Sequence, residues 1–266
     1  MKKPLIILTG PTAVGKTKLS ISLAQAVNGA IISADSMQVY RHMDIGSAKI
    51  RPEEMCGVPH YLIDVLDPSE EFHVVKFVEL AHEAMEKIYA AGQIPIVTGG
   101  TGFYIQALLK EVDFTESHGE LSIRKQLEEK AATEEGAAEL YRELSEVDPA
   151  SAETIHPNNV KRVIRALEYY HETGQKISEH NEEQKQKESP YCSAYFVLND
   201  ERSILYDRID RRVDQMICDG LVDEVFRLKE MGYTRDLVSM QGLGYKELFP
   251  YLAGECTLEE AVYIIK

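Results

Sequence analysis

The amino-acid sequence predicts an α/β protein in which a parallel β-sheet is flanked by helices and carries a helical insertion. In the first half of the chain, short apolar runs alternate with longer segments of helical periodicity. This alternation is typical of a parallel sheet covered by helices. From about residue 112 to residue 190 the chain becomes charged, helical and poor in strand-like runs. We therefore expect a core domain of residues 1–111 and 191–266, and a helical insertion domain of residues 112–190.

The core elements are placed by apolar runs and by the glycines that follow them. Gly92, Gly220 and Gly232 each follow an apolar helical segment, and glycine ends helices because it adopts the left-handed conformation without strain. The expected core strands are residues 5–9, 30–34, about 61–65, 94–98 and 192–199. The expected core helices are residues 15–27, 74–90, 203–218 and 221–231.

The insertion domain is expected to contain three amphipathic helices. The first begins at Leu121 and the second spans residues 137–144. The third begins near Val160 and ends at Gly174. The polar stretch 178–190 has no core-forming residues, so we expect a mobile connection there.

The segment GPTAVGKT has the residue spacing of a phosphate-binding loop and lies between an apolar strand and a helix, which is the context that such a loop requires. Its glycines let backbone N–H groups face an anion, and the helix N-terminus adds positive charge. Lys16 supplies a full charge and Thr17 offers a hydroxyl to Mg²⁺. The fold class is therefore P-loop NTPase-like, although the loop does not reveal whether the ligand is a nucleotide. The expected diphosphate-binding residues are Gly10, Pro11, Thr12, Ala13, Val14, Gly15, Lys16 and Thr17, with Thr17 as the metal ligand.

The composition limits the classes of function. The 266 residues carry a formal net charge of −15, which argues against nonspecific nucleic-acid binding over the whole surface. No apolar run approaches the ~18 residues of a membrane span, and no signal-peptide pattern precedes the first strand. We therefore expect a cytoplasmic protein without a membrane partner. The four cysteines are widely separated, so neither a zinc site nor a disulfide framework is indicated.

Two further polar segments follow predicted strands, and the carboxyl ends of parallel strands meet at one edge of a sheet. Asp35 in IISADSMQVY can hold Mg²⁺, act as a base toward an acceptor, or cap the following turn. The spacing does not choose among these roles. Ser36, Gln38 and Tyr40 add two polar side chains and an aromatic surface, which suit a nucleobase. The segment IVTGGTGFY supplies a second glycine-rich turn, which can place the Thr101 hydroxyl against an anion.

Two predicted helices carry closely spaced basic residues. HPNNVKRVIRALEYY places Lys161, Arg162 and Arg165 on one side of a helix, within one turn of each other. LYDRIDRRVDQM carries three arginines among carboxylates, beginning with Arg208. Ordinary solvated or ion-paired charge explains many such residues, but one of the three arginines can reach a bound diphosphate.

Six motifs occur in register along the chain, namely GPTAVGKT, D-S-x-Q-x-Y, DIGSAK, GGTGFY, HPNNVKRVIRALE and MQGLGYKE. Together they resemble those of the tRNA dimethylallyltransferases, also called tRNA isopentenyltransferases, and the similarity runs from Pro4 to the last residue. Each motif alone is ambiguous, but six in order are specific. The resemblance implies transfer of a dimethylallyl group from dimethylallyl diphosphate to N6 of an adenosine beside the tRNA anticodon. It also implies Mg²⁺ as the cofactor, and we expect a monomer.

In that family the phosphate loop holds a prenyl diphosphate in place of ATP. The adenine amino group is a poor nucleophile whose proton becomes acidic only as the C–N bond forms, so an ordinary carboxylate can accept it. Negative charge develops on the leaving diphosphate, where Lys16, Mg²⁺ and the loop amides would stabilise it. By this resemblance the catalytic residues are Asp35, Thr101 and Arg208.

The resemblance also implies how the RNA is held. The adenine leaves its stack and enters a channel, while the insertion domain grips the anticodon stem-loop through a local basic track. The family usually has aspartate where this chain has Asn159, and its members continue into a basic C-terminal helix, so we expect reduced tRNA affinity if the chain ends at Lys266. The expected tRNA-binding residues are Asp35, Ser36, Met37, Gln38, Thr101, Arg124, Lys161, Arg162 and Arg165.

Two other functions share parts of this pattern. A small-molecule or nucleoside-monophosphate kinase would use the same phosphate loop, direct Asp35 toward an acceptor hydroxyl and consume ATP. A noncatalytic RNA-binding module would keep the glycine turns and arginine helices without turnover. Prenylated adenosine as a product distinguishes the transferase from both.

Overall fold

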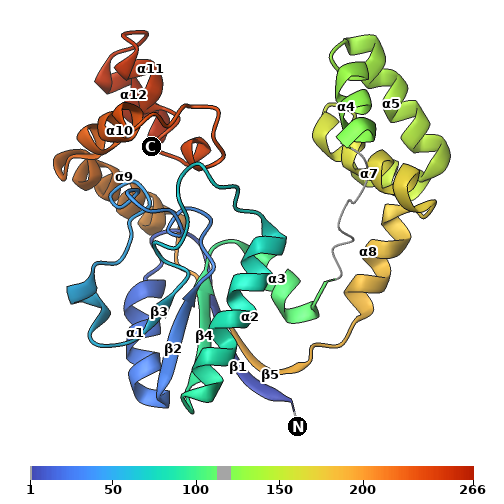
Figure 1. Cartoon of the computed structure of the whole chain (residues 1–266). Coiled ribbons are helices and arrows are strands. Elements are labelled where there is room, and N and C mark those ends of the chain that lie inside the picture. The colour runs from blue at the N-terminus through green and yellow to red at the C-terminus, as the bar shows by residue number, and fades with distance from the viewer. Residues whose placement is uncertain (1, 113–120) are drawn as a thin grey trace. The chain divides into compact units, whose positions relative to one another are not determined.

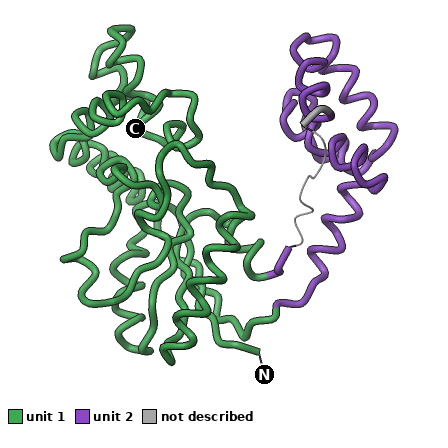
Figure 2. Tube along the Cα trace, viewed as in Figure 1, with its two compact units in different colours: residues 1–109, 190–266 green, residues 110–189 purple. Residues whose placement is uncertain are grey.

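The computed structural model describes residues 2–112 and 121–266, and the chain divides into two compact units (Figure 2). Unit 1 comprises Met1–Leu109 and Pro190–Lys266, and unit 2 comprises Lys110–Ser189. The insertion expected at residues 112–190 differs from unit 2 by two residues at its start and one at its end. Unit 2 therefore interrupts the chain between two segments that fold together.

Unit 1 is built on a five-stranded sheet whose neighbouring strands all pair in parallel (Figure 1). The strands are β1 Lys3–Thr9, β2 Gly29–Ser33, β3 His60–Tyr61, β4 Ile94–Gly99 and β5 Tyr191–Val197. Their order across the sheet is β3-β2-β4-β1-β5. The expected α/β class, with a parallel sheet flanked by helices, is confirmed. Because β1, β2 and β4 are neighbours, the segments that follow them meet at one edge of the sheet.

Helices cover both faces of this sheet. The helices of unit 1 are α1 Lys16–Val27, α2 Val74–Ala90, α3 Gly102–Lys110, α9 Arg202–Cys218, α10 Leu221–Glu230, α11 Leu248–Leu252 and α12 Leu258–Ile265, with short 3₁₀ helices η1 Pro52–Met55 and η2 Ser239–Gln241. Ile31 belongs to the apolar cluster that contains Ala24 of α1, whereas Ile32 belongs to the cluster that contains Phe77 of α2. Successive residues of a strand point to opposite faces, so α1 and α2 cover opposite sides of the sheet.

The strand expected near residues 61–65 is wrong in extent, because β3 ends at Tyr61. Leu62 and Asp64 have positive φ angles of 63° and 56°, and this left-handed conformation interrupts extended pairing. The Asp64 carboxylate forms an ion pair with the ammonium group of Lys49, a side chain that is only 5% exposed. The same ammonium group donates to the Tyr40 carbonyl at 2.7 Å. The chain turns after β3 to bring these two segments together.

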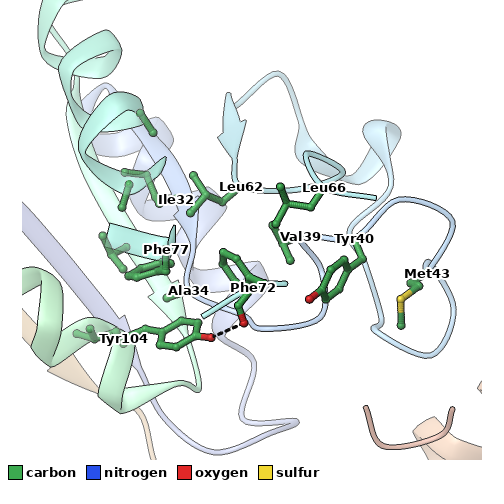
Figure 3. Packing of buried hydrophobic residues seen from close by; sticks show 14 of the residues in the cluster. Ile32, Ala34, Val39, Tyr40, Met43, Leu62, Leu66, Phe72, Phe77 and Tyr104 are labelled. Carbon is green, nitrogen blue, oxygen red and sulfur yellow. Dashed lines mark hydrogen bonds between the residues drawn. The ribbon is translucent and has the colours of Figure 1, made fainter. Parts of the chain in front are cut away.

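Tyr40 anchors the segment after β2 in the apolar core (Figure 3). Its ring lies edge-on to Phe72, with ring centroids 6.4 Å apart, and Phe72 lies edge-on to Tyr104 at 5.6 Å. The prediction that Tyr40 offers an aromatic surface to a nucleobase is wrong, because the residue is 0% exposed. Burial, the main cause, raises the pKa of Tyr40 to about 12. Tyr40 instead fixes the end of the polar segment that begins at Asp35.

Unit 2 is a helical unit with its own apolar core. Its helices are α4 Leu121–Lys130, α5 Glu134–Val147, α6 Pro149–Thr154, α7 Val160–Thr173 and α8 Ile177–Gln186. Leu140, Leu144 and Leu167 are fully buried in one cluster between these helices. The three expected amphipathic helices are present as α4, α5 and α7. Asn159 stands at the N-cap of α7, where its side chain accepts no capping hydrogen bond from the described residues.

The prediction of a mobile connection at residues 178–190 is wrong, since most of this stretch forms α8. The segment is rich in Glu, Gln and Lys, which are strong helix formers. Lys185 and Glu182, three residues apart, form an ion pair of 3.2 Å, and Gln184 is buried. A lack of apolar residues therefore did not prevent the helix, because polar contacts hold it to the unit.

Asp148 makes the main polar connection between α6 and α8. Its buried carboxylate accepts hydrogen bonds from the Ser151 and Ser178 hydroxyls, both at 2.6 Å, and from their backbone N–H groups at 3.1 and 3.0 Å. Burial is the largest single influence and acts to raise the pKa of Asp148. The four hydrogen bonds together outweigh it and hold that pKa below 3.8.

Asp148→Ala is expected to destabilise unit 2 by about 2–3 kcal/mol at neutral pH, because it leaves buried donors without an acceptor. The pKa of this carboxyl is lowered by folding, so the stabilisation is present above the unfolded value of 3.8 and is lost as the pH falls through the lower folded value. Urea titrations of both proteins at pH 7 and pH 3, followed by circular dichroism, measure the difference. Glu146→Ala, at an exposed position of α5, is the control. A difference between wild type and D148A that is as large at pH 3 as at pH 7 would contradict the assignment.

Candidate active site

The phosphate loop joins β1 to α1 and depends on an unusual backbone path. Gly10 has a φ of 150°, and a Cβ atom there would lie 2.5 Å from the carbonyl oxygen of Leu198. Ala13 and Gly15 have left-handed φ angles of 64° and 95°. Only glycine fits at position 10, because the loop passes directly against the chain that leaves β5.

Lys16 lies over this loop at the start of α1. Its ammonium group donates to the carbonyls of Gly10 at 2.8 Å and Pro11 at 2.7 Å. Burial lowers the pKa of Lys16, the Asp35 carboxylate opposes that shift, and Arg212 adds to it. The first turn of α1 carries no acidic residue. Its positive end and the lysine therefore form a site suited to an anion.

Asp35 follows β2 and performs one of the three roles left open for it. Its Oδ1 atom accepts hydrogen bonds from the backbone N–H groups of Met37 at 2.8 Å and Gln38 at 3.2 Å, so it caps the following turn. The charge of the same carboxylate acts to raise the pKa of both Lys16 and Arg212, while burial, the larger influence, lowers both values. Asp35 is thus fixed by its own turn and lies close enough to Lys16 and Arg212 to influence both.

Arg212, one turn after Arg208 on α9, is the charged residue that the sequence did not single out. It is partly buried, and burial lowers its pKa while Asp35 raises it. Arg208 has a side chain that is 46% exposed and donates to Asp200 at 2.9 Å and to the Ala13 carbonyl at 3.4 Å. Arg208 and Arg212 are four residues apart and so lie on one face of α9. This spacing was the sequence feature that could have indicated Arg212. Arg208 contacts the phosphate loop at the Ala13 carbonyl, whereas Arg212 is close enough to Asp35 for that charge to oppose the lowering of its pKa by burial.

Lys16, Asp35 and Arg212 line a cavity of about 580 Å³. The lining residues are Thr12, Ala13, Gly15, Lys16, Thr17, Asp35, Ser36, Met37, Gln38, Gly46, Ser47, Gly100, Ile209, Arg212, Val213, Met216, Leu243, Gly244 and Ile265. Gly10, Pro11 and Val14 belong to the loop and are not among them. A second cavity of about 970 Å³ shares Thr17, Arg212 and Met216 with the first. The cavity thus combines cations, one carboxylate and a wall of apolar side chains.

The second glycine-rich turn brings β4 against the end of β2. A Cβ atom on Gly99 would lie 2.2 Å from the carbonyl oxygen of Ala34, so this close approach requires glycine. Of this turn, Gly100 lines the cavity among the described residues and Thr101 does not. The Thr101 carbonyl accepts from the N–H groups of Tyr104 and Ile105 at 3.0 and 3.2 Å, and so begins α3.

The predicted basic residues of unit 2 fall into two groups. Lys161 and Arg162 are exposed at the start of α7, and no ion pair in the described part of the chain involves either. Arg124 and Arg165 both bind the buried carboxylate of Glu168, at 3.5 and 2.9 Å. The carboxylate of Glu168 thus holds two arginines from different helices. Lys161 and Arg162, in contrast, are exposed to solvent.

Two features are absent from the described residues. None of the described helices has the length and apolar character needed to cross a membrane. Within residues 2–112 and 121–266, no three His, Cys, Asp or Glu side chains form a group that could hold a metal ion.

Comparisons with known proteins agree with one another. A family model described as IPP transferase matches residues 38–266. A curated tRNA dimethylallyltransferase of Lachnoclostridium phytofermentans is 65% identical over 264 residues, covering 99% of this chain and 84% of that protein. The chain is therefore similar to this relative over nearly its whole length.

Solved structures give the same result. The full-length tRNA isopentenylpyrophosphate transferase of Bacillus halodurans has a TM-score of 0.72 and 46% identity, with 100% of this chain and 82% of that chain covered. A tRNA delta(2)-isopentenylpyrophosphate transferase of Staphylococcus epidermidis has a TM-score of 0.70 and 43% identity, with 99% and 85% covered. A eukaryotic dimethylallyltransferase acting on tRNA has a TM-score of 0.86 and 36% identity, with 99% and 66% covered.

Proposed function

Because this chain belongs to the IPP transferase family, we propose that it transfers a dimethylallyl group from dimethylallyl diphosphate to N6 of an adenosine beside the tRNA anticodon. The bond between the allylic carbon and the bridging oxygen breaks, a C–N bond forms, and diphosphate leaves. One observation carries the proposal: the 580 Å³ cavity places the phosphate loop, two cations and the Asp35 carboxylate around a single space.

The cations of the cavity suit the leaving group. Lys16 and Arg212 both line it, and charge that develops on the diphosphate is stabilised most by donors held in place before the reaction. Ile209, Val213 and Met216 line the same cavity and offer apolar contact to the five-carbon group. Arg208, bound to the Ala13 carbonyl, supports the loop from outside. The donor is therefore held by charge at one end and by apolar contact at the other.

Asp35 is suited to accept the proton from the adenine amino group. Its carboxylate lines the cavity and its orientation is fixed by two backbone N–H groups. The proton becomes acidic only as the new C–N bond forms, so a carboxylate can remove it in that step. Ser36, Met37 and Gln38 directly follow Asp35 in the sequence and line the same cavity. We propose that their side chains contact the adenine base.

Mg²⁺ is the proposed cofactor, with the Thr17 hydroxyl as its protein ligand. Thr17 lies in the first turn of α1 and lines both cavities. Mg²⁺ keeps several waters and binds substrate phosphates through few protein ligands, which is compatible with a cavity whose lining contains one carboxylate, Asp35. When bound, the ion supplies positive charge to the departing diphosphate. We also propose that the protein acts on tRNA in the cytoplasm and as a monomer.

The exposed cations of α7 are proposed to bind RNA phosphates. Replacing Lys161 and Arg162 together by alanine is expected to weaken tRNA binding roughly tenfold at physiological salt and to reduce the salt dependence by about one unit of slope for each phosphate that is no longer neutralised. Filter binding over a range of salt concentrations measures both quantities. Lys125→Ala with Arg142→Ala, which removes the same charge from exposed positions of unit 2, is the matched control. Equal salt slopes for the two double variants would contradict a specific role for α7.

The proposed function is tested by one assay. The protein is incubated with Mg²⁺, labelled dimethylallyl diphosphate and unmodified tRNA, and prenylated adenosine and free diphosphate are measured. We expect both products in equal amounts, and neither when tRNA is omitted. A parallel incubation with ATP tests the kinase alternative, and ATP consumption without transfer of the label would overturn the proposal.

A further inference from the structure

Glu224 of α10 is a buried carboxylate that lies outside the proposed chemistry and yet binds four donors. The residue is 2% exposed. Its Oε2 atom accepts from the backbone N–H groups of Asp44 at 3.0 Å and Ile45 at 2.8 Å. Its Oε1 atom accepts from the Gly46 N–H at 3.2 Å and from the Tyr245 hydroxyl at 2.7 Å. Two segments distant in sequence are thus joined at one carboxylate.

The three backbone donors are consecutive, and successive N–H groups that converge in this way form a concave site for an anion. Here the anion is a side chain of the same protein. A buried carboxylate without partners would be strongly unfavourable, and the three partly buried N–H groups would each lose an acceptor without it. Each side therefore requires the other, and the path of residues 44–46 depends on the charge at position 224.

Tyr245 completes the arrangement from the other segment. It is fully buried, and burial together with the Glu224 carboxylate raises the pKa of its hydroxyl. A Cβ atom on Gly46 would lie 2.6 Å from the Tyr245 ring, so the two segments are in direct contact. Likewise, a Cβ atom on Gly242 would lie 2.4 Å from the Met37 methyl group. The turn at residues 242–245 thus packs against both the 44–46 segment and the turn that follows Asp35.

Both segments form walls of the cavity. Gly46, Ser47, Leu243 and Gly244 line it. The Gln38 side-chain amide donates to the carbonyls of Ser47 at 3.3 Å and Ala48 at 3.4 Å. Its oxygen accepts from the Ser33 hydroxyl at 3.1 Å. Gln38 is therefore bound to residues 47–48, which directly follow the 44–46 segment that Glu224 holds, and neither segment belongs to the phosphate loop.

We infer that Glu224 is a positioning residue for the acceptor side of the reaction, which fixes the cavity wall against which the adenosine is held without touching either substrate. This inference rests on the proposed function. A change at Glu224 should therefore lower kcat/KM for tRNA more than it lowers the affinity for the diphosphate donor. Glu224 holds residues 44–46, of which Gly46 lines the cavity, and its four hydrogen-bond donors all lie outside the phosphate loop.

Glu224→Gln is the test, because glutamine has the same shape but only one accepting oxygen. Its amide nitrogen must face one pair of donors and leaves a backbone N–H without an acceptor. A displacement of ~1 Å in a positioning group can cost on the order of a hundredfold in rate, so we expect kcat/KM for tRNA to fall by about ten- to a hundredfold. Affinity for inorganic pyrophosphate with Mg²⁺, measured by calorimetry without tRNA, should stay within about threefold of wild type.

Two further variants separate this role from a loss of folding. Tyr245→Phe keeps the ring packed on Gly46 and removes one hydrogen-bond donor to Glu224. We therefore expect kcat/KM for tRNA to fall less than in E224Q. Glu230→Gln removes an exposed carboxylate from the same helix and should match wild type. The inference is overturned if E224Q uses tRNA as well as wild type, or if pyrophosphate affinity falls as far as kcat/KM for tRNA. Absence of prenyl transfer by wild type would instead count against the proposed function.

Discussion

Replacing Asp35 by asparagine is expected to reduce kcat for prenyl transfer by a factor of about 10²–10⁴, the range associated with removal of a general base. Affinity for tRNA should change by no more than a few-fold. The reason is geometric. Asparagine keeps an oxygen that can accept the hydrogen bonds from Met37 and Gln38, so the turn persists while the proton acceptor is removed. Single-turnover reactions with enzyme in excess measure the chemical step, and filter binding measures tRNA affinity.

The alanine variant at the same position separates the two roles of this side chain. Asp35→Ala removes both the base and the cap, so two backbone N–H groups in the cavity wall lose their acceptor. We expect turnover as low as in D35N, together with weaker tRNA use caused by the altered turn. If D35N retained near wild-type turnover, Asp35 would be only a turn cap, and the proton would have to leave by another route.

The parts of this structure that the sequence predicted are those encoded locally. The phosphate loop was recognisable because eight consecutive residues contain its glycines, its lysine and its threonine. The parallel sheet followed from apolar runs alternating with helical periodicity, and each of the expected core strands and helices has a counterpart. Such features depend on neighbouring residues, so a single sequence contains most of the information.

The parts that could not be predicted depend on contacts between distant residues. Tyr40 looked like a binding surface because its sequence neighbours are polar, but its burial against Phe72 is a tertiary contact. The stretch forming α8 looked too polar for structure, but Ser178 binds Asp148, thirty residues earlier. The link from Glu224 to residues 44–46 spans about 180 positions, and no local pattern marks it. Contacts between residues distant in the sequence, both aromatic and polar, thus account for these differences.

Arg212→Ala is expected to lower kcat/KM for dimethylallyl diphosphate on the order of a hundredfold, as is typical when a fixed donor to a developing negative charge is removed. Two observations support this expectation. Arg212 lines the cavity with Lys16 and Asp35, and its partial burial reduces screening by solvent. Steady-state kinetics with the donor varied, together with calorimetric binding of inorganic pyrophosphate and Mg²⁺, measure the loss.

Arg208→Ala is the matched control, because it removes the same group from the same helix one turn earlier. Its side chain is 46% exposed and is paired with Asp200, and surface pairs contribute little. Its remaining contact is with the Ala13 carbonyl at 3.4 Å. We therefore expect kcat/KM for dimethylallyl diphosphate to fall by only a few-fold. An equal loss in the two variants would show that Arg208 also reaches the diphosphate, as the sequence first suggested. A larger loss in R208A than in R212A would mean that the leaving group lies outside the cavity described above.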